Sequence, residues 1–504
     1  MAALGGVSTL FLIVVGLYFL VIFGIGYYAY RRTETEDDFL VANREIGPLV
    51  GAATLSATQL SAGTFVGLVG IHYLTGISFM WEWPTLWLGW IVALVFIAPQ
   101  MRRFGELTVP DFLGRRYGDD GANGNRIRAL GAVLIVLAYT IYISAQYTAA
   151  GLVFQSMFGI EQSLGMGLMV AVVLIYTVIG GMRASMLTDF VQLIVMLTGA
   201  FIAVPLILSL VGGISELNAM LASVNPEFVG WYWEPVEIST IGLAFGFSLA
   251  AAPNEIARIY SMRDGETVRT AIGLTLVFQV VIAAGMALVG MSMFVLFPEL
   301  TTPDLASIIM SINVLGPVLG ALLISAILSA MLSTVDSIMI VSASGIAHDL
   351  YAKIINPEAT ERQKLRVNRA TIVILGLIPL ALALQGELLG GLVQLIVLLQ
   401  ASMMGGMFFI TILLGLHWKR ATAAGGFAAI VAGLITVLAW HILTDRGIVT
   451  GFPAQLDPVM PGVAVSFVTL VIVSLATEPP SRESLEPFFD IGPDSDQEAT
   501  PGDD

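Results

Sequence analysis

Long uninterrupted apolar stretches constrain this chain more than any other feature of its sequence. About 20 apolar residues cross a hydrocarbon core of about 30 Å, and such stretches occur thirteen times along the 504 residues. Only 12% of the residues are charged, against about a quarter in a soluble globular chain. The sequence therefore predicts an all-α polytopic membrane protein with spans at 7–30, 47–73, 78–100, 127–158, 163–183, 187–213, 239–260, 269–297, 315–346, 369–389, 390–416, 421–443 and 458–476.

The basic residues predict how these spans are oriented. With the N-terminus placed outside, all but one of the 22 Lys and Arg residues fall on the cytoplasmic side, and the exception is Arg446. Such a bias is the positive-inside rule. We therefore expect an outside N-terminus, an inside C-terminus and a plasma-membrane location. The first stretch lacks a basic leader and is too long for a signal peptide, so we interpret it as a retained span.

Composition excludes several function classes. The basic residues are scattered and form no nucleic-acid patch, and the absence of cysteine removes disulfides, thiolate metal sites and haem attachment. No phosphate-binding loop, nucleophile elbow or paired-carboxylate motif of a soluble enzyme occurs. None of the four histidines has metal-ligand spacing; they are His72, His348, His417 and His441. We expect no enzyme activity, no organic cofactor, no bound nucleic acid and no obligate protein partner. Membrane lipid is the expected surrounding.

About half of the net charge of −15 lies at one end of the chain. Beyond Thr477 the sequence has nine carboxylates and the single base Arg482, together with Pro, Ser and Gly. Such a composition is typical of disorder. We expect one transporter domain over 1–476 and an acidic, disordered cytoplasmic tail over 477–504.

Two spans contain breaks in corresponding positions. The second carries small polar residues from Ser56 to Thr64, and the seventh carries Ala250 to Glu255 with Pro253 between them. They are five spans apart, and an odd offset means that the two face opposite ways. Spans 2–6 (47–213) and 7–11 (239–416) are thus predicted to be inverted repeats with broken helices, an arrangement typical of alternating-access transporters.

A stripe of hydroxyl groups follows the ninth span. It comprises Ser325, Ser329, Ser333 and Ser337, with Thr334 and Asp336 beside it. A hard monovalent cation such as sodium is held by about five oxygens, which neutral hydroxyls and unwound carbonyls supply. Ser333, Thr334 and the unwound backbone near Ala57 and Leu60 offer such a set.

Several motifs of this chain resemble those of the sodium:solute symporter family. They are AILSAMLSTVDSIMIVSASGIAHDLYAK from Ala326, YTVIGGMRASMLTDFVQ from Tyr176, and the shorter runs DDFLVANREIGPL, SAGTFVGLVG, LTVPDFLGRRYG and LLGLHWKRAT. The resemblance covers almost the whole chain. It implies a core of leucine-transporter type over spans 2–11, with one sodium between spans 2 and 9.

The resemblance also implies a set of ion ligands. They are the backbone carbonyls of Ala57, Leu60 and Ala330 and the hydroxyls of Ser333 and Thr334. Asp189 is implicated in sodium coupling by the same resemblance, although a solvated carboxylate or a helix cap near the interface is an equal alternative. Asp336 lies deeper, where a carboxylate needs a partner; it either holds a second ion or anchors the site, or it pairs with a cytoplasmic Arg.

The solute is expected near the midplane, between spans 2, 3, 4, 7 and 11. Candidate contacts are Gln59, Ser61, Tyr142, Gln146, Phe245, Leu249, Pro253, Asn254 and Gln400. Tyr142 lies where proline symporters, by resemblance, have a tyrosine that affects binding. The chain departs from that subgroup at Gln59, which replaces an aspartate, and in FGFSLAAAPNE, so the resemblance does not specify proline.

Three further positions carry charge or aromatic rings. Glu255 and Arg258 are three residues apart, and we expect an ion pair along one helix face. Glu82, in the run WEWP, is expected to be a gate or a solute contact at the outer mouth. The flanking Trp81 and Trp83 are typical of an interfacial aromatic belt.

The leading hypothesis is a sodium-coupled importer of a small organic solute, such as an amino acid, carboxylate, vitamin or sugar, that works by alternating access. One alternative is a proton-driven transporter of the same fold, with Asp336, Glu255 or Asp189 titrating. A second is a membrane solute sensor, which the short tail disfavours.

Overall fold

The computed structural model describes residues 7–31, 42–104, 108–118, 121–385 and 392–489. Regular structure in these residues is helical, apart from an isolated bridge between Ile46 and Met262. Ten helices are long and apolar enough to cross a membrane, or eleven when one bent pair counts as a single span. The all-helical class is therefore confirmed, while the count of thirteen spans and their orientation stay predictions. Predicted limits at 386–391 lie outside the described residues.

The second predicted span is broken where the sequence indicated. Helix α3 (Pro48–Gln59) ends at Leu60, and the chain resumes as the wide helical turn η2 (Gly63–Leu68) and α4 (Val69–Thr75). Leu60 has an extended backbone, with φ −78° and ψ 93°. Pro48 at the first turn of α3 has the φ angle that a helix start requires. The break thus spans Leu60 to Ala62.

The seventh predicted span is broken in the same manner. Helix α11 (Pro235–Ala251) and α12 (Pro253–Ser261) meet at Ala252, which is extended, and the two axes differ by 44°. Pro253 lacks an N–H and clashes with a preceding helical turn, so it ends α11 and begins α12. Both predicted breaks are confirmed.

The remaining long helices follow the predicted spans. In chain order they are α1 (Thr9–Tyr30), α5 (Glu82–Val92) continued by η4 (Ala93–Ile97) and α6 (Ala98–Phe104), α8 (Ala122–Phe158), α9 (Gln162–Leu210), α13 (Gly265–Leu296), α15 (Pro317–Ser344) continued by η8 (Gly345–Ile355), α16 (Glu361–Ala383), α17 (Val393–Met404) continued by η9 (Gly405–Phe409) and α18 (Ile410–His417), α19 (Ala423–Asp445) and α20 (Val459–Ala476). Helix α9 contains predicted spans 5 and 6, separated by a kink at Gly181, where φ is 60°.

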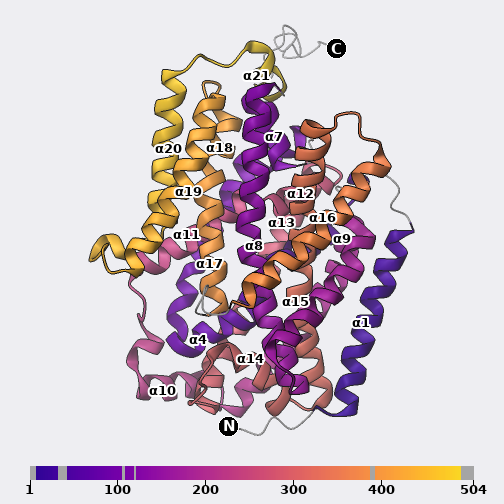
Figure 1. The fold of residues 1–504 in the computed structure, drawn as a ribbon. Coiled ribbons are helices and arrows are strands. Elements are labelled where there is room, and N and C mark those ends of the chain that lie inside the picture. Colours follow the sequence, from indigo (N-terminus) through magenta and orange to yellow (C-terminus); the bar gives the residue numbers. More distant parts are fainter. Residues whose placement is uncertain (1–6, 32–41, 105–107, 119–120, 386–391, 490–504) are drawn as a thin grey trace, which may run out of the picture.

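Short helices occupy both ends of the bundle. Helix α7 (Val109–Gly118) lies near one end, and α10 (Ile214–Val224), the turn η6 (Pro303–Leu305) and α14 (Ala306–Ile309) lie near the other (Figure 1). Helix α1 packs along α9 on one flank, and α19 with α20 forms the opposite flank (Figure 1). Helix α15 packs against α9 and α3 and is buried along nearly its whole length. The broken spans therefore lie beside a helix that is almost wholly enclosed by protein.

The segment after Thr477 differs in part from the predicted disordered tail. Residues 482–489 form the short helix α21 (Arg482–Phe489), and Phe488 stacks on Phe104 with ring centroids 4.4 Å apart. The Arg116 guanidinium lies 5.8 Å from the Phe488 ring centre. The prediction of a disordered tail considered its acidic composition and overlooked the two phenylalanines at the end of α21. Residues 490–504 lie outside the described part.

Candidate functional site

The break in the second span meets the hydroxyl stripe of α15. The Ser333 hydroxyl lies 2.7 Å from the Ala57 carbonyl oxygen and 3.2 Å from that of Ala330. The Thr334 hydroxyl lies 3.1 Å from the Thr58 carbonyl oxygen and 3.0 Å from that of Ala330. Carbonyls in the last turn of a helix have no intrahelical donor, so oxygens outnumber donors here. Such an oxygen-rich, uncharged cluster can hold a hard cation.

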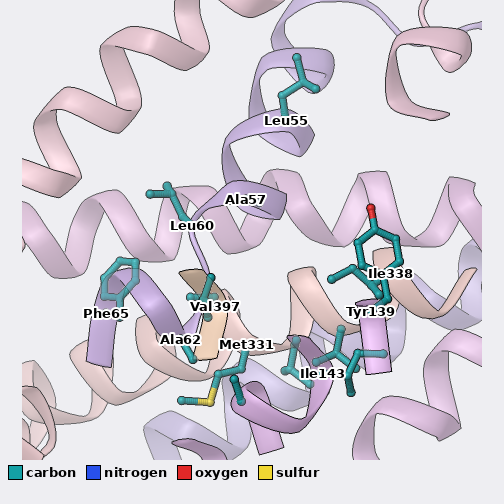
Figure 2. Close-up of a cluster of buried hydrophobic side chains, with 14 of the residues drawn as sticks. Leu55, Ala57, Leu60, Ala62, Phe65, Tyr139, Ile143, Met331, Ile338 and Val397 are labelled. Carbon is teal, nitrogen blue, oxygen red and sulfur yellow. The ribbon is translucent and has the colours of Figure 1, made fainter. Parts of the chain in front are cut away.

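Leu60 lies at the same break, one turn beyond Ala57. Figure 2 shows Ala57 and Leu60 where the helix that carries Leu55 ends, with Ala62 and Phe65 on the ribbon that follows. The structure thus brings four of the five predicted sodium ligands into direct contact and places Leu60 beside them.

The four serines of the stripe do not share one role. The Ser329 hydroxyl bonds the Tyr18 hydroxyl of α1 at 2.9 Å, and the Ser337 hydroxyl is bonded by the Arg258 guanidinium. Ser325 Oγ is buried without a partner among the described residues. Ser333 and its neighbour Thr334 bond carbonyls in the last turn of α3, and the Ser337 hydroxyl lies 3.5 Å from the Thr58 hydroxyl. The roles differ because a spacing of four residues drifts around a helix with 3.6 residues per turn.

A buried charged cluster lies next to the oxygen-rich cluster. Arg258 Nη2 lies 3.0 Å from Asp189 Oδ2, and the side chains of both residues are fully buried. The Asp189 carboxylate also accepts the Thr54 hydroxyl at 2.5 Å. The Asp336 carboxylate accepts the hydroxyls of Ser185 and Ser337 at 3.2 and 3.1 Å. This cluster joins α12, α3, α9 and α15.

Two expectations about these charges are wrong. Arg258 does not pair with Glu255 along one helix face; instead the Gln59 amide donates to Glu255 at 2.9 Å. Asp189 is neither solvated nor a helix cap, since it is fully buried within α9. Residues three apart share a helix face only roughly, and the neighbouring helices supply closer partners here. The cluster has two carboxylates and one guanidinium, and Asp189 Oδ1 and Asp336 Oδ2 have no hydrogen-bond partner among the described residues.

A cavity of about 80 Å³ borders the first break. Five of the nine predicted solute contacts line it, namely Gln59, Ser61, Tyr142, Phe245 and Leu249. The other lining residues are Leu60, Gly63, Thr64, Leu68, Glu82, Trp83, Leu86, Gln279, Gln394 and Val397. A cavity of this size suits a small solute.

The other four predicted contacts lie outside this lining. Gln146 accepts the Ala62 N–H at 2.8 Å and so caps the second half of the broken span. Asn254 accepts the Tyr139 hydroxyl, and Pro253 begins α12. Gln400 is buried within α17. Polar residues near a break can support the backbone as readily as a ligand, and the sequence does not distinguish the two.

Sequence reasoning missed Thr64, Gln279 and Gln394 as lining residues, and it placed Trp83 differently. Trp81 is half exposed, as a belt residue would be, but Trp83 is buried and lines the cavity. Glutamines in two apolar helices, α13 and α17, were a signal, because an amide in a span needs a partner.

The structure also joins three residues that the sequence left apart. Ligand atoms of Asp111, His348 and Asp349 lie within 4.8 Å of one another, although these residues come from two distant segments of the sequence. Arg128 Nη2 lies 2.9 Å from Asp111 Oδ1, and Lys353 Nζ lies 3.8 Å from it. These cations already supply positive charge to the carboxylates, so the group fits an ion-pair cluster that ties α7 to α8 and η8.

Comparisons with known proteins indicate the family and the fold of this chain. A model of the sodium:solute symporter family matches residues 39–433. The osmoregulated proline transporter OpuE of Bacillus subtilis is 29% identical over 95% of this chain and 97% of its own length. The high-affinity proline transporter PutP of the same organism is 29% identical over 92% and 98%. A sodium/proline symporter of Staphylococcus aureus is 28% identical over 93% of each chain.

Two solved structures share the fold. A substrate-bound, outward-open, sodium-coupled sialic acid symporter superposes with a TM-score of 0.80 at 19% identity, over 94% of this chain and 99% of that one. The nucleobase-cation-symport transporter Mhp1 superposes with a TM-score of 0.57 at 12% identity, over 89% and 97%. At these identities the likeness concerns the fold.

Proposed function

Because the chain belongs to the sodium:solute symporter family, we propose that it is a secondary transporter that imports a small organic solute together with sodium by alternating access. It is a membrane transport protein and not an enzyme. The observation that carries the mechanism is the meeting of Ser333 and Thr334 with the carbonyls at the end of α3.

Sodium at this site would connect two elements that can separate. The Ala57 carbonyl belongs to a half-helix that ends at Gln59, whereas the Ala330 carbonyl and both hydroxyls belong to the long helix α15. An ion coordinated by both favours the arrangement in which they touch, and it shifts the equilibrium by its differential affinity. We propose Ala57, Leu60, Ala330, Ser333 and Thr334 as its ligands.

The carboxylates beside this site give a second part of the coupling. Asp189 and Asp336 have one unpartnered oxygen each, and Arg258 balances only one of the two charges. We propose that this cluster responds to the sodium ion and transmits its presence to α12, the inner half of the second broken helix. The thirteen spans, an outside N-terminus and a core of leucine-transporter type over spans 2–11 belong to the same proposal.

The solute would bind in the cavity above the sodium site. Ser61 follows Leu60 directly, and both line the cavity, so the ion and the solute share one segment of backbone. This shared segment accounts for coupling, since each ligand orders the break that the other uses. The proline transporters among the relatives make proline the first solute to test.

Proteoliposomes loaded with potassium buffer and diluted into sodium buffer test this function. We expect labelled proline, or another small solute that competes with it, to accumulate only with an inward sodium gradient. Uptake of the same solute under a pH gradient in sodium-free buffer is the control. Accumulation driven by the pH gradient alone would overturn sodium coupling, and binding without accumulation would indicate a sensor.

A further inference from the structure

Glu82 is a buried carboxylate without a partner. It begins α5, is only 2% exposed and lines the cavity. No described residue donates a hydrogen bond to its side chain or forms an ion pair with it, and its Oε2 atom is fully enclosed. An unpaired charge in an apolar surrounding is costly. The described part of the chain therefore supplies no cation to balance this carboxylate.

The rest of the cavity is neutral and partly aromatic. Among the described lining residues Glu82 is the charged one, and the other polar groups are amides and hydroxyls. The rings of Trp83, Tyr142 and Phe245 lie in the same lining. Aromatic faces attract organic cations through their quadrupole. A carboxylate together with three rings is a receptor for a positively charged nitrogen.

The cavity also lacks the usual receptor for an anion. Half-helix N-termini at a break can bind a carboxylate through free N–H groups, but here these groups are occupied. Gln146 Oε1 accepts from Ala62 at 2.8 Å, and the Ser61 hydroxyl accepts from Gly63 at 2.9 Å. The next two N–H groups donate to the Ser61 carbonyl oxygen at 3.0 and 3.2 Å.

The first-turn N–H groups after the second break are occupied in the same manner. Pro253 has no N–H, and the Asn254 N–H faces the Tyr139 hydroxyl at 3.4 Å. The following two N–H groups donate to the Ala252 carbonyl oxygen at 3.1 and 3.0 Å. The N–H groups in the first helical turn after each break are thus occupied within the protein.

The packing of α5 against α11 fixes Glu82 in this position. A Cβ atom on Gly242 would lie 2.0 Å from the Glu82 carbonyl oxygen, so only glycine allows this approach. The Thr85 hydroxyl donates to the same carbonyl oxygen at 2.9 Å. The backbone of Glu82 is therefore held, and its carboxylate faces the cavity.

We propose that the solute of this cavity carries an ammonium group and that the Glu82 carboxylate binds it. Primary, secondary and quaternary amines share this chemistry, including the ammonium end of a zwitterionic amino acid. The proposal rests on the transport function proposed above for the same cavity. It disfavours solutes whose only charge is negative, such as simple carboxylates, because the Glu82 carboxylate has the same charge.

A thermal-stability titration of the purified protein at constant sodium concentration tests the proposal. The ammonium-bearing probes are proline, pyrrolidine and choline; N-acetylproline, which has a carboxylate but no ammonium, is the matched probe. We expect at least one ammonium probe to stabilise the protein and N-acetylproline to have no effect. Stabilisation by N-acetylproline alone, or by none of the ammonium probes, would overturn the proposal.

The variant Glu82→Gln keeps the shape of the side chain and removes its charge. We expect the apparent affinity for the ammonium probe to fall at least tenfold, as for loss of a charged hydrogen bond. Glu82→Asp should retain part of the affinity, and Glu234→Gln, an exposed carboxylate before α11, should retain all of it. Unchanged affinity in Glu82→Gln contradicts the proposal.

The sodium response separates this inference from the transport function. Sodium alone should stabilise the wild type and Glu82→Gln equally, and this also shows that the variant is folded. If sodium has no effect on the wild type, the proposed symport fails. If Glu82→Gln folds but loses its sodium response, the carboxylate serves the ion and the inference fails. Should Glu82→Gln not fold, the probe series on the wild type still decides.

Discussion

Arg258 of α12 and Asp189 of α9 form an ion pair of 3.0 Å that is wholly enclosed by protein. The pair links α12, one half of a broken span, to the long helix α9, and Thr54 extends it to α3, one half of the other broken span, at 2.8 Å from Arg258 Nε. Any movement of the two half-helices relative to α9 must therefore rearrange these charges.

Removing one member of this pair is expected to be more damaging than removing both. Arg258→Met or Asp189→Asn alone leaves a buried group unpaired, which costs about 3–5 kcal/mol. The double variant Arg258→Met with Asp189→Asn should lose less stability than either single variant, and so less than the sum of the single losses. Thermal unfolding at a fixed scan rate measures this, and strictly additive losses would show that the pair is not energetically coupled.

The hydroxyls at the sodium cluster should control the ion affinity. Ser333→Ala or Thr334→Ala is expected to raise the sodium concentration for half-maximal uptake about tenfold or more, if each hydroxyl contributes about 1.5 kcal/mol. Ser344→Ala on the same helix is the control, since its hydroxyl bonds the Val341 carbonyl of its own turn. Unchanged sodium activation in both variants would exclude the proposed ligands.

A loop carboxylate at the start of α20 should make stability depend on pH. Burial raises the pKa of Asp457 to about 7, although Ser402 and the Val459 N–H donate to it. The folded protein then binds more protons than the unfolded one between about pH 4 and 7, so this contribution is complete below about pH 4 and is lost as pH rises through 7.

We expect Asp457→Asn to flatten the dependence of the unfolding temperature on pH in that window. Glu358→Gln, an exposed carboxylate in the loop before α16, is the control and should leave the slope unchanged. A slope that persists in Asp457→Asn would assign it to another group.

The approach of α11 to α5 should be sensitive to a single methyl group. Gly242→Ala would clash with the Glu82 carbonyl oxygen and the Thr85 hydroxyl, so we expect lower stability, by about 1–3 kcal/mol, and weaker solute binding. Gly273→Ala in α13, where nothing lies within 4 Å, should be neutral or stabilising. Equal behaviour of the two variants in unfolding and binding titrations would contradict the close packing.

Local signals in the sequence predicted much of this architecture. Pro253 and the run of small residues near Leu60 marked both breaks, because a proline and a cluster of hydroxyl-bearing residues interrupt helices by local chemistry. Ser333 and Thr334 were recognised from their spacing and from the family motif. The partner of Arg258 was not recognised from the sequence, because a helix face offers several neighbours. The packing of α9 selects Asp189.

The sequence by itself determined that this chain lies in a membrane, and it determined the helical class, the two breaks and the family. Each of these follows from composition, spacing or motif along a single segment. The tertiary structure decided which carboxylates are paired and which are not. Asp189 and Glu82 both lie in apolar helices, yet one receives a guanidinium and the other faces a cavity. Charge pairing depends on distances between helices that lie far apart in the chain, and these distances arise only when the helices pack.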